Sequence, residues 1–374
     1  MEDNFKRIIR VPSSKQLSRA NLSGKRVLAR FDFNVPIEDG KIEDEKRINA
    51  AIPTIEKILE KDPAEINIIC HLGRPEKPKD KNFSTKIIAE YLAAVLHCRQ
   101  EPKEFQTDIK SPALDKFYQI SDKIRLFENL RYDEREEKNS VIFARELARL
   151  GDVFVLDAFA NIHRQHTSMD AIQDILPTYV GLIMEKEINT LFKVLNSPER
   201  PFVAIIGGAK VEDKLPIIQA FSKRADAVIV GGKTANEWIE KGIPSGKNVF
   251  LPADGINKFG SIVFMDVENI KKGVFDIGPQ TIMLYKSVLA SAKTIFWNGN
   301  LGMTEDHKFV HGTYEIARYM QKIKCEKIAS GGNTAEVIDE MGIASDFDFI
   351  STGGGATSDF VTGKKLPVLE KILK

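Results

Sequence analysis

The chain has 374 residues, 43% of them hydrophobic and 29% charged, which suits two globular domains better than one. The charges of its 54 basic and 53 acidic residues nearly cancel. This argues against a general nucleic-acid or membrane-surface binder, because such a protein needs an excess of basic residues. Residues 1–14 lack the apolar core of a signal peptide, no apolar run is long enough to span a bilayer, and the three scattered cysteines fit a reducing compartment.

Short apolar runs alternate with longer amphipathic stretches, which is typical of βαβ units and parallel sheets. In chain order, the runs expected as strands are 26–33, 66–70, 124–127, 153–156, 202–206, 227–230, 294–297, 327–329 and 347–350. Between the fourth and fifth runs, the apolar positions of 176–196 approximate a helical period. We therefore expect an α/β protein with two doubly wound, Rossmann-like parallel-sheet domains joined by a long helix.

Cationic and polar residues follow the expected strands of the first half. They are Asp32, Asn34, His71, Arg74, Arg131, His163, Arg164 and His166, and Arg47 opens the helix that should run to residue 59. Arginine suits bidentate contact with carboxylate or phosphate, so this set predicts a basin for a small acid that carries both groups. Asp32 and Asn34 should point the same way along a strand and position a hydroxyl. The alternative is that these side chains form ion pairs that hold loops together. For His163 and His166, hydrogen-bonded packing explains the residues about as well as ligand binding does.

Glycine-containing turns follow all five expected strands of the second half, at 207–210, 231–233, 298–300, 331–334 and 353–355. Glycine lets backbone N–H groups approach an anion closely, and the helix that follows offers its positive end. One such turn is weak evidence, but five favour a nucleotide-phosphate site over turn chemistry alone. Lys210 and Lys214 should share one helix face there. No GxGxxG follows a strand and no complete Walker A loop is present, which argues against a dehydrogenase.

A cationic basin on one domain and a glycine-rich edge on the other indicate phosphoryl transfer across a cleft. That reaction needs positioning, charge neutralisation and exclusion of water rather than a protein nucleophile. The sequence agrees, because it shows no serine–histidine–acid or cysteine–histidine signature. Domain closure would bring the two halves together.

Long segments resemble the phosphoglycerate kinase family, in order over nearly the whole chain. They are 24–36 (GKRVLARFDFNVP), 47–55 (RINAAIPTI), 71–75 (HLGRP), 128–131 (ENLR), 157–168 (DAFANIHRQHTS), 185–187 (EKE), 200–214 (RPFVAIIGGAKVEDK), 276–279 (DIGP), 297–299 (WNG) and 351–356 (STGGGA). The resemblance implies a cytoplasmic, typically monomeric glycolytic enzyme. It would interconvert 3-phosphoglycerate plus ATP with 1,3-bisphosphoglycerate plus ADP, using magnesium.

The resemblance also implies roles for particular residues. Phosphoglycerate contacts would be Asp32, Asn34, Arg47, His71, Arg74, Arg131 and Arg164. Nucleotide contacts would be Gly207, Gly208, Lys210, Lys214, Gly231, Asn298, Glu305, Gly331, Gly332, Asn333 and Thr334. Catalytic contacts would be Arg47, Lys214, Gly332 and Gly355, and no residue is assigned as a metal ligand. The implied domains are 1–180 with the tail 361–374 for phosphoglycerate, a connecting helix at 181–196, and 197–360 for the nucleotide.

Departures from the family pattern gather in the nucleotide half. Asn333 replaces an aspartate on the magnesium side, Lys233 replaces a glycine beside the adenine, and Asn300 replaces a proline under the nucleotide ring. The stretch between Trp238 and Asp276 is shorter than usual by about one helix. An alternative is therefore a phosphoglycerate-binding homologue with lost or altered nucleotide and metal use. A third possibility is a kinase for a different acid or nucleotide.

Overall fold

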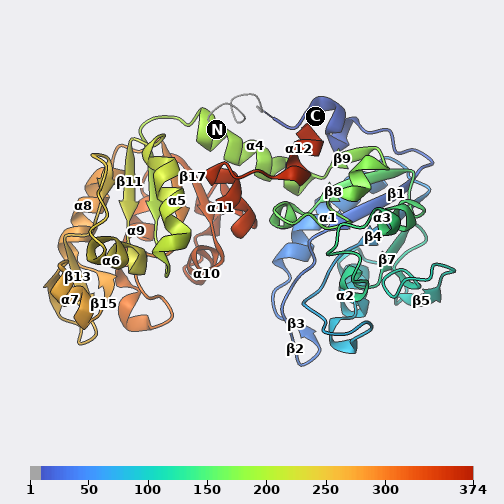
Figure 1. Ribbon diagram of the computed structural model, residues 1–374, viewed down its shortest axis with the longest axis horizontal. Helices are drawn as coiled ribbons and strands as arrows, with labels where there is room; N and C mark the ends of the chain where they lie inside the picture. Colours follow the sequence, from blue (N-terminus) through green and yellow to red (C-terminus); the bar gives the residue numbers. More distant parts are fainter. Residues whose placement is uncertain (1–9, 374) are drawn as a thin grey trace. The chain divides into compact units, whose positions relative to one another are not determined.

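The structure is a computed structural model that describes residues 10–373 (Figure 1). The chain divides into two compact units. The first unit runs to Asn189 and resumes at Lys365, and the second comprises Thr190–Lys364. The domain boundaries expected from the resemblance, at 180/181 and 360/361, stay a prediction.

The first unit is built on a seven-stranded sheet. In spatial order its strands are β5 (Lys103–Gln106), β6 (Lys116–Gln119), β7 (Ile124–Phe127), β4 (Glu65–Ile69), β1 (Arg26–Phe31), β8 (Val153–Asp157) and β9 (Thr178–Val180). Strands β7, β4, β1, β8 and β9 are parallel to one another, while β5 and β6 pair antiparallel at one edge. From β1 the chain first adds β4 and β7 on one side and later β8 and β9 on the other. Strand β1 is therefore the topological switch point, beside which doubly wound sheets bind ligands.

Helices cover both faces of this sheet. They are α1 (Lys46–Leu59), α2 (Lys86–Val95), α3 (Val141–Ala148) and α12 (Pro367–Leu373), and a hairpin of β2 (Ile37–Glu38) and β3 (Lys41–Ile42) precedes α1. Alternate residues of β1, such as Ala29 and Phe31, join a buried cluster with Ile55 of α1 and Leu92 of α2. Arg30, between them in sequence, lies on the opposite face of the sheet and is 1% exposed.

The second unit has a six-stranded parallel sheet. In spatial order its strands are β12 (Val249–Phe250), β11 (Ala227–Val230), β10 (Phe202–Ile206), β16 (Thr294–Asn298), β17 (Glu326–Ser330) and β18 (Phe349–Ser351). The strand order reverses between β10 and β16, which makes that pair the switch point of this sheet. An antiparallel sheet of β14 (Ile262–Phe264), β13 (Asp254–Asn257) and β15 (Val274–Ile277), with α7 (Val267–Lys272), occupies much of the stretch between Trp238 and Asp276.

Helices also cover both faces of the six-stranded sheet (Figure 1). They are α5 (Val211–Ser222), α6 (Gly232–Glu240), α8 (Pro279–Leu289), α9 (His311–Gln321), α10 (Gly332–Glu340) and α11 (Gly355–Thr362). Trp297 of β16 joins a core cluster with Tyr285 of α8 and Met320 of α9. Its neighbour Phe296 instead packs on Phe221 of α5, with ring centroids 4.8 Å apart. The alternation along one strand confirms the expected doubly wound fold.

Helix α4 (Leu182–Asn196) begins later than the periodicity predicted. The expectation of helix from residue 176 is wrong, because Thr178–Val180 pairs with β8 as strand β9. The first turn of α4 is instead held by Asp157, whose carboxylate accepts from Met184 N at 2.8 Å and from Thr54 Oγ1 at 2.5 Å. In the part of the chain that the structure describes, none of the helices could cross a membrane.

The buried carboxyl of Asp157 predicts a pH-dependent stability. Burial raises the pKa of Asp157 to about 7, against roughly 4 in an unfolded chain. Between these values the folded state keeps a proton that the unfolded state has released, so the free energy of unfolding falls as pH rises from about 4 to 7. We expect Asp157→Asn to flatten this slope in urea titrations. Asp152→Asn is the control with the opposite sign, because its hydrogen bond from Arg26 lowers the pKa of Asp152. A slope that Asp157→Asn leaves unchanged would contradict the prediction.

Candidate active site

In the first unit, most of the predicted residues lie where the parallel strands end. Arg47, in the first turn of α1, donates through Nη1 to Asp32 Oδ2 at 2.8 Å and to the carbonyl of Asn34 at 3.3 Å. Asn34 Oδ1 accepts from the backbone N of Gly73 at 2.8 Å, which ties the segment after β1 to the segment after β4. The expectation that Asp32 and Asn34 lie on a strand is wrong, since β1 ends at Phe31 and both residues belong to the loop beyond it.

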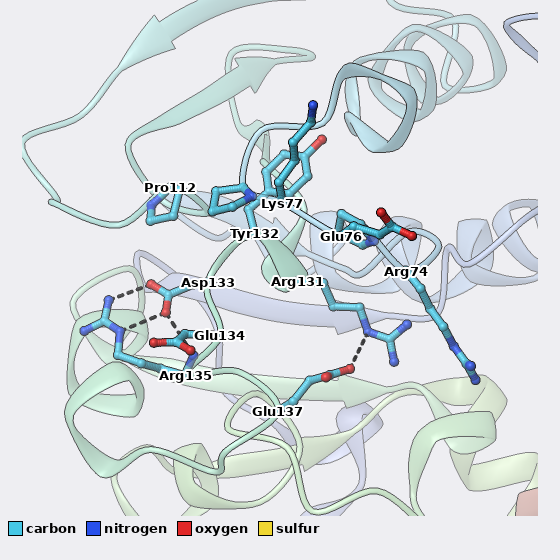
Figure 2. A pocket seen from close by; sticks show the side chains of 12 residues that line it. Arg74, Glu76, Lys77, Pro112, Arg131, Tyr132, Asp133, Glu134, Arg135 and Glu137 are labelled. Carbon is cyan, nitrogen blue, oxygen red and sulfur yellow. Dashed lines mark hydrogen bonds and ion pairs between the residues drawn. The ribbon is translucent and has the colours of Figure 1, made fainter.

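Arg74 and Arg131 line one cavity of about 650 Å³ (Figure 2). Its other lining residues are Pro75, Glu76, Lys77, Pro78, Pro112, Tyr132, Asp133, Glu134, Arg135 and Glu137. Arg131 donates through Nη1 to the carbonyl of Gly73 at 2.6 Å, and its Nε lies 3.1 Å from Glu137 Oε1. The exposed Arg74 side chain makes no hydrogen bond or ion pair with another described residue. Arg131 is thus held in place, while Arg74 stays available to a ligand.

The cations of this region lie close enough to affect one another. Burial, and then the charges of Arg164, Arg30 and Arg74, lower the pKa of Arg131, while nearby Glu137 opposes the shift. Burial, followed by the cluster's cations, lowers the pKa of His166 to about 4. His71 is 4% exposed, and burial followed by nearby cations lowers its pKa well below the usual range. The structure therefore brings together His71, Arg74, Arg131 and Arg164 of the predicted set, which we call the cationic basin.

Sequence reasoning missed Arg30, which adjoins this basin from inside β1. Its guanidinium lies 2.8 Å from Nδ1 of His71 and also donates to the carbonyl of Phe31. The available signal was a charged residue in the middle of an apolar run, since arginine is rarely buried unless it is paired.

In the second unit, Lys214 and Asn298 meet beside the switch point. Lys214, in α5, donates through Nζ to Asn298 Oδ1 at the end of β16. Burial lowers the pKa of Lys214, and the carboxylate of Asp213 partly opposes the shift. Gly208 has φ +113°, and a Cβ there would lie 3.2 Å from Lys214 Cε. Glycine after β10 therefore makes room for the lysine as well as for the turn.

The expected pairing of Lys210 with Lys214 on one helix face is wrong. Helix α5 begins at Val211, and Lys210 precedes it with extended dihedrals of φ −135° and ψ 118°. The Lys210 side chain is exposed and makes no hydrogen bond or ion pair with another described residue, so it stays available to a ligand.

The three departures from the family pattern lie at the edge of the second sheet where the glycine turns follow the strands, which we call the crest. Two of them, Asn300 and Asn333, contact each other. Asn300 is 3% exposed and donates through Nδ2 to Thr304 Oγ1 at 2.7 Å and to the carbonyl of Asn333 at 3.2 Å. Asn333 in turn donates through Nδ2 to Glu305 Oε1 at 3.2 Å. The amide of Asn333 therefore contacts the carboxylate of Glu305, another predicted nucleotide contact. Lys233 is exposed in the first turn of α6.

The glycines of the five turns are not all explained alike. Several of them, such as Gly208 and Gly331, have a positive φ, which favours glycine. A Cβ at Gly207 would collide with the carbonyl of Asn300, and one at Gly231 would collide with Leu301, so close backbone packing explains glycine at both. At Gly332 and Gly355 a Cβ would meet nothing within 4 Å. Both begin helices, α10 and α11, and turn chemistry does not account for them. Glycine at these helix starts suits close approach of an anion to backbone N–H groups.

Two further predicted residues, Thr334 and Asn298, stabilise the crest through hydrogen bonds between neighbouring strand ends. Thr334 Oγ1 accepts from Gly299 N at 2.7 Å, and Asn298 Nδ2 donates to the carbonyl of Ser330 at 3.1 Å. Gly331, at the N-cap of α10, has φ +99°, which favours glycine. These contacts link the ends of β16 and β17 into one rigid edge.

One doubly wound unit with a cationic basin, and another with glycine-led helix starts beside a half-buried lysine, define a phosphoryl-transfer enzyme. The phosphoglycerate kinase family model matches residues 17–262 and 233–364. Phosphoglycerate kinase of Coprothermobacter proteolyticus is 35% identical, covering 94% of this chain and 97% of its own length, and that of Borreliella afzelii is 37% identical, covering 94% and 98%. The solved phosphoglycerate kinase of Coxiella burnetii matches with a TM-score of 0.84 at 31% identity, covering 96% of this chain and 98% of its own.

The chain belongs to the phosphoglycerate kinase family. It is a kinase, a phosphotransferase with a carboxyl group as acceptor, as the sequence predicted. The alternative of a phosphoglycerate-binding homologue with lost or altered nucleotide and metal use is not favoured.

Proposed function

We propose that the cationic basin of the first unit binds 3-phosphoglycerate and that the second unit binds ATP or ADP, for reversible phosphoryl transfer in glycolysis. The observation that carries this proposal is the gathering of Arg74, Arg131 and Arg164 around buried His71. These cations lie close enough for the charges of Arg164 and Arg74 to add to burial in lowering the pKa of Arg131, although Glu137 opposes them. A phosphorylated acid would add negative charge there, and arginine matches both of its anionic groups.

The residues divide by the task that their chemistry suits. Asn34, Arg74 and Arg131 would bind and orient the acid, while Arg47, held by Asp32, would neutralise the moving phosphoryl group. On the nucleotide side, Lys214 would meet the transferred group. Backbone N–H groups at the Gly332 and Gly355 helix starts would stabilise its developing charge.

The remaining nucleotide contacts would hold ATP or ADP along the same crest. They are Gly207, Gly208, Lys210, Gly231, Asn298, Glu305, Gly331, Asn333 and Thr334. We further propose that the enzyme acts as a cytoplasmic monomer and uses no nucleic-acid partner, in keeping with its net charge of +1.

Magnesium would be held mainly by the nucleotide. Within residues 10–373, no group of three histidine, cysteine or acidic side chains is placed to hold a metal ion. A site with so few protein ligands still fits Mg²⁺, which commonly binds through one or two carboxylates plus substrate phosphates and keeps several waters. Asp213, next to Lys214 in the first turn of α5, is the carboxylate that would hold it, and the bound ion would supply charge neutralisation to the phosphates.

A coupled assay tests the proposed function directly. Purified protein with 3-phosphoglycerate, ATP and magnesium should form ADP at a rate that depends on all three additions. If the protein turns over ATP with another phosphorylated acid but not with 3-phosphoglycerate, the substrate must be reassigned.

Asn333 offers a test of metal use. We expect Asn333→Asp to lower the magnesium concentration needed for half-maximal turnover and to raise turnover, because a carboxylate adds the negative charge that the amide lacks. Asn333→Ala is the matched control, since it removes the hydrogen bond to Glu305 without adding charge. If both variants respond alike in a magnesium titration, release of Glu305 is responsible rather than charge. If neither differs from the parent, Asn333 is no defect.

A further inference from the structure

Four buried polar side chains form a continuous line behind the cationic basin. Ser168 Oγ donates to Glu136 Oε1 at 2.6 Å, and the Ser168 backbone N donates to Oε2 at 3.0 Å. Arg30 Nε donates to the same Ser168 Oγ at 3.1 Å, and Arg30 Nη2 lies 2.8 Å from His71 Nδ1. The four side chains are at most 4% exposed, so water does not compete for these contacts.

The direction of each hydrogen bond in this line is determined by Arg30. A guanidinium can only donate, because it has five N–H groups and no acceptor. Ser168 Oγ must therefore accept from Arg30, which leaves its own hydrogen for Glu136. By the same rule His71 Nδ1 must accept, so it carries no proton. The ring's only proton is then on Nε2.

We propose that Arg30 is a positioning residue of the phosphoglycerate site: it holds His71 as a neutral imidazole whose Nε2–H is the one donor the ring can offer an anionic substrate. The inference rests on the proposed function only in taking His71 as a substrate contact. Glu136 and Ser168 complete the device, since they fix the plane of the guanidinium and supply the opposite charge behind it.

The surroundings of His71 act in the same direction. The charged and titratable groups around it are Arg30 from β1, Arg131 after β7, and Arg164 and His166 after β8. Each disfavours a second positive charge on the ring, as burial does. Attraction for the substrate is already supplied by the arginines. A neutral ring adds a directional hydrogen bond at no electrostatic cost, and that bond should not change between about pH 5 and 8.

Nitrogen NMR on the full-length protein tests the tautomer without any substitution in Arg30. With ¹⁵N-labelled histidine, we expect the His71 Nδ1 resonance at the position of an unprotonated nitrogen and Nε2 at that of a protonated one. Neither should move between about pH 5 and 8, while free histidine in the same sample titrates. The loss of these signals in His71→Gln assigns them. A protonated Nδ1, or titration of the ring in this range, would overturn the proposal whether or not 3-phosphoglycerate binds.

Two amide substitutions test which nitrogen serves the substrate. The amide of glutamine reaches about as far as Nε2, and that of asparagine about as far as Nδ1. We expect His71→Gln to bind 3-phosphoglycerate about fivefold to tenfold more tightly than His71→Asn in calorimetry. Equal affinities, or the reverse order, would contradict an Nε2 donor. Failure of the parent protein to bind would instead contradict the proposed function.

Arg30→Met tests the positioning role itself. Burial and the remaining cations should keep the His71 ring neutral in this variant, but without the guanidinium both tautomers should become populated, so that the Nδ1 and Nε2 resonances move toward each other. The affinity for 3-phosphoglycerate should fall on Arg30→Met in the parent and much less in the His71→Gln background, because Arg30 acts through the ring. If the histidine signals stay as in the parent while Arg30→Met weakens binding equally in both backgrounds, Arg30 acts as a bulk charge and the proposal fails.

Discussion

Lys214→Ala should lower the rate constant for turnover by about 10²–10³-fold while changing the nucleotide affinity far less. The side chain is half-buried, hydrogen-bonded to Asn298 and placed in the first turn of α5 beyond the glycines of β10. Its charge would meet the phosphoryl group as that group leaves one oxygen for another. An interaction made mainly in the transition state acts on kcat rather than on KM.

The control for Lys214 is available in the same helix. Lys223 is exposed at the C-terminal end of α5, so Lys223→Ala removes the same charge without touching the crest. It should leave kcat and KM unchanged. A Lys214→Ala enzyme that retains kcat and shows only a raised KM for ATP would mean that the lysine contributes ground-state binding.

Arg74→Ala and Arg131→Ala should each weaken 3-phosphoglycerate binding by about 1.5–3 kcal/mol, roughly 10- to 150-fold in Kd. The two substitutions differ in what else they disturb. Arg74 makes no hydrogen bond or ion pair with a described residue, so its loss should leave the fold intact. Arg131 also donates to the carbonyl of Gly73, so Arg131→Ala should cost some stability in addition.

Lys77→Ala separates specific contact from general charge in the same experiment. Lys77 lines the same cavity as Arg74 and Arg131 but is not among the predicted substrate contacts. Calorimetry should show a small change for Lys77→Ala that disappears at high salt, because exposed charges are screened. Loss of affinity of equal size in all three variants, removed by salt, would mean that the basin attracts anions without a defined site.

The sequence predicted the sheet cores more completely than the hydrogen bonds at their edges. Strands β10 and β11 match the expected residues without a shift, because five or four consecutive apolar residues can be buried only in a doubly covered parallel sheet. Strands β5 and β6 escaped notice. All four residues of β5 are exposed, so it carries no burial pattern, and β6 is mostly half-buried. The periodicity wrongly assigns β9 to the start of α4, since three residues are too few to display a period of their own.

The site was predictable by residue type and place along the chain, but not by partner. Successive arginines and glycines after strands indicated where ligands would bind, since parallel strands share one carboxyl edge. Nothing in the sequence showed that Asn333 faces Glu305 or that Lys210 lies before its helix, because both depend on one or two backbone dihedrals. The role proposed for Arg30 could not be predicted from the sequence. Side chains alternate along β1, so Arg30 lies on the opposite face of the sheet from Ala29 and Phe31, and the apolar pattern gives no information about contacts on that face.

Helix α12 bears on the order in which the polypeptide can fold during synthesis. Val368 and Ile372 of α12 are fully buried, and Lys371 Nζ lies 2.9 Å from Asp170 and 2.7 Å from Asp174 in the first unit. The second unit is therefore one uninterrupted stretch, while the first is completed only by residues that leave the ribosome after it. The second unit can close its core on the nascent chain, whereas the first unit is completed only once α12 has been synthesised.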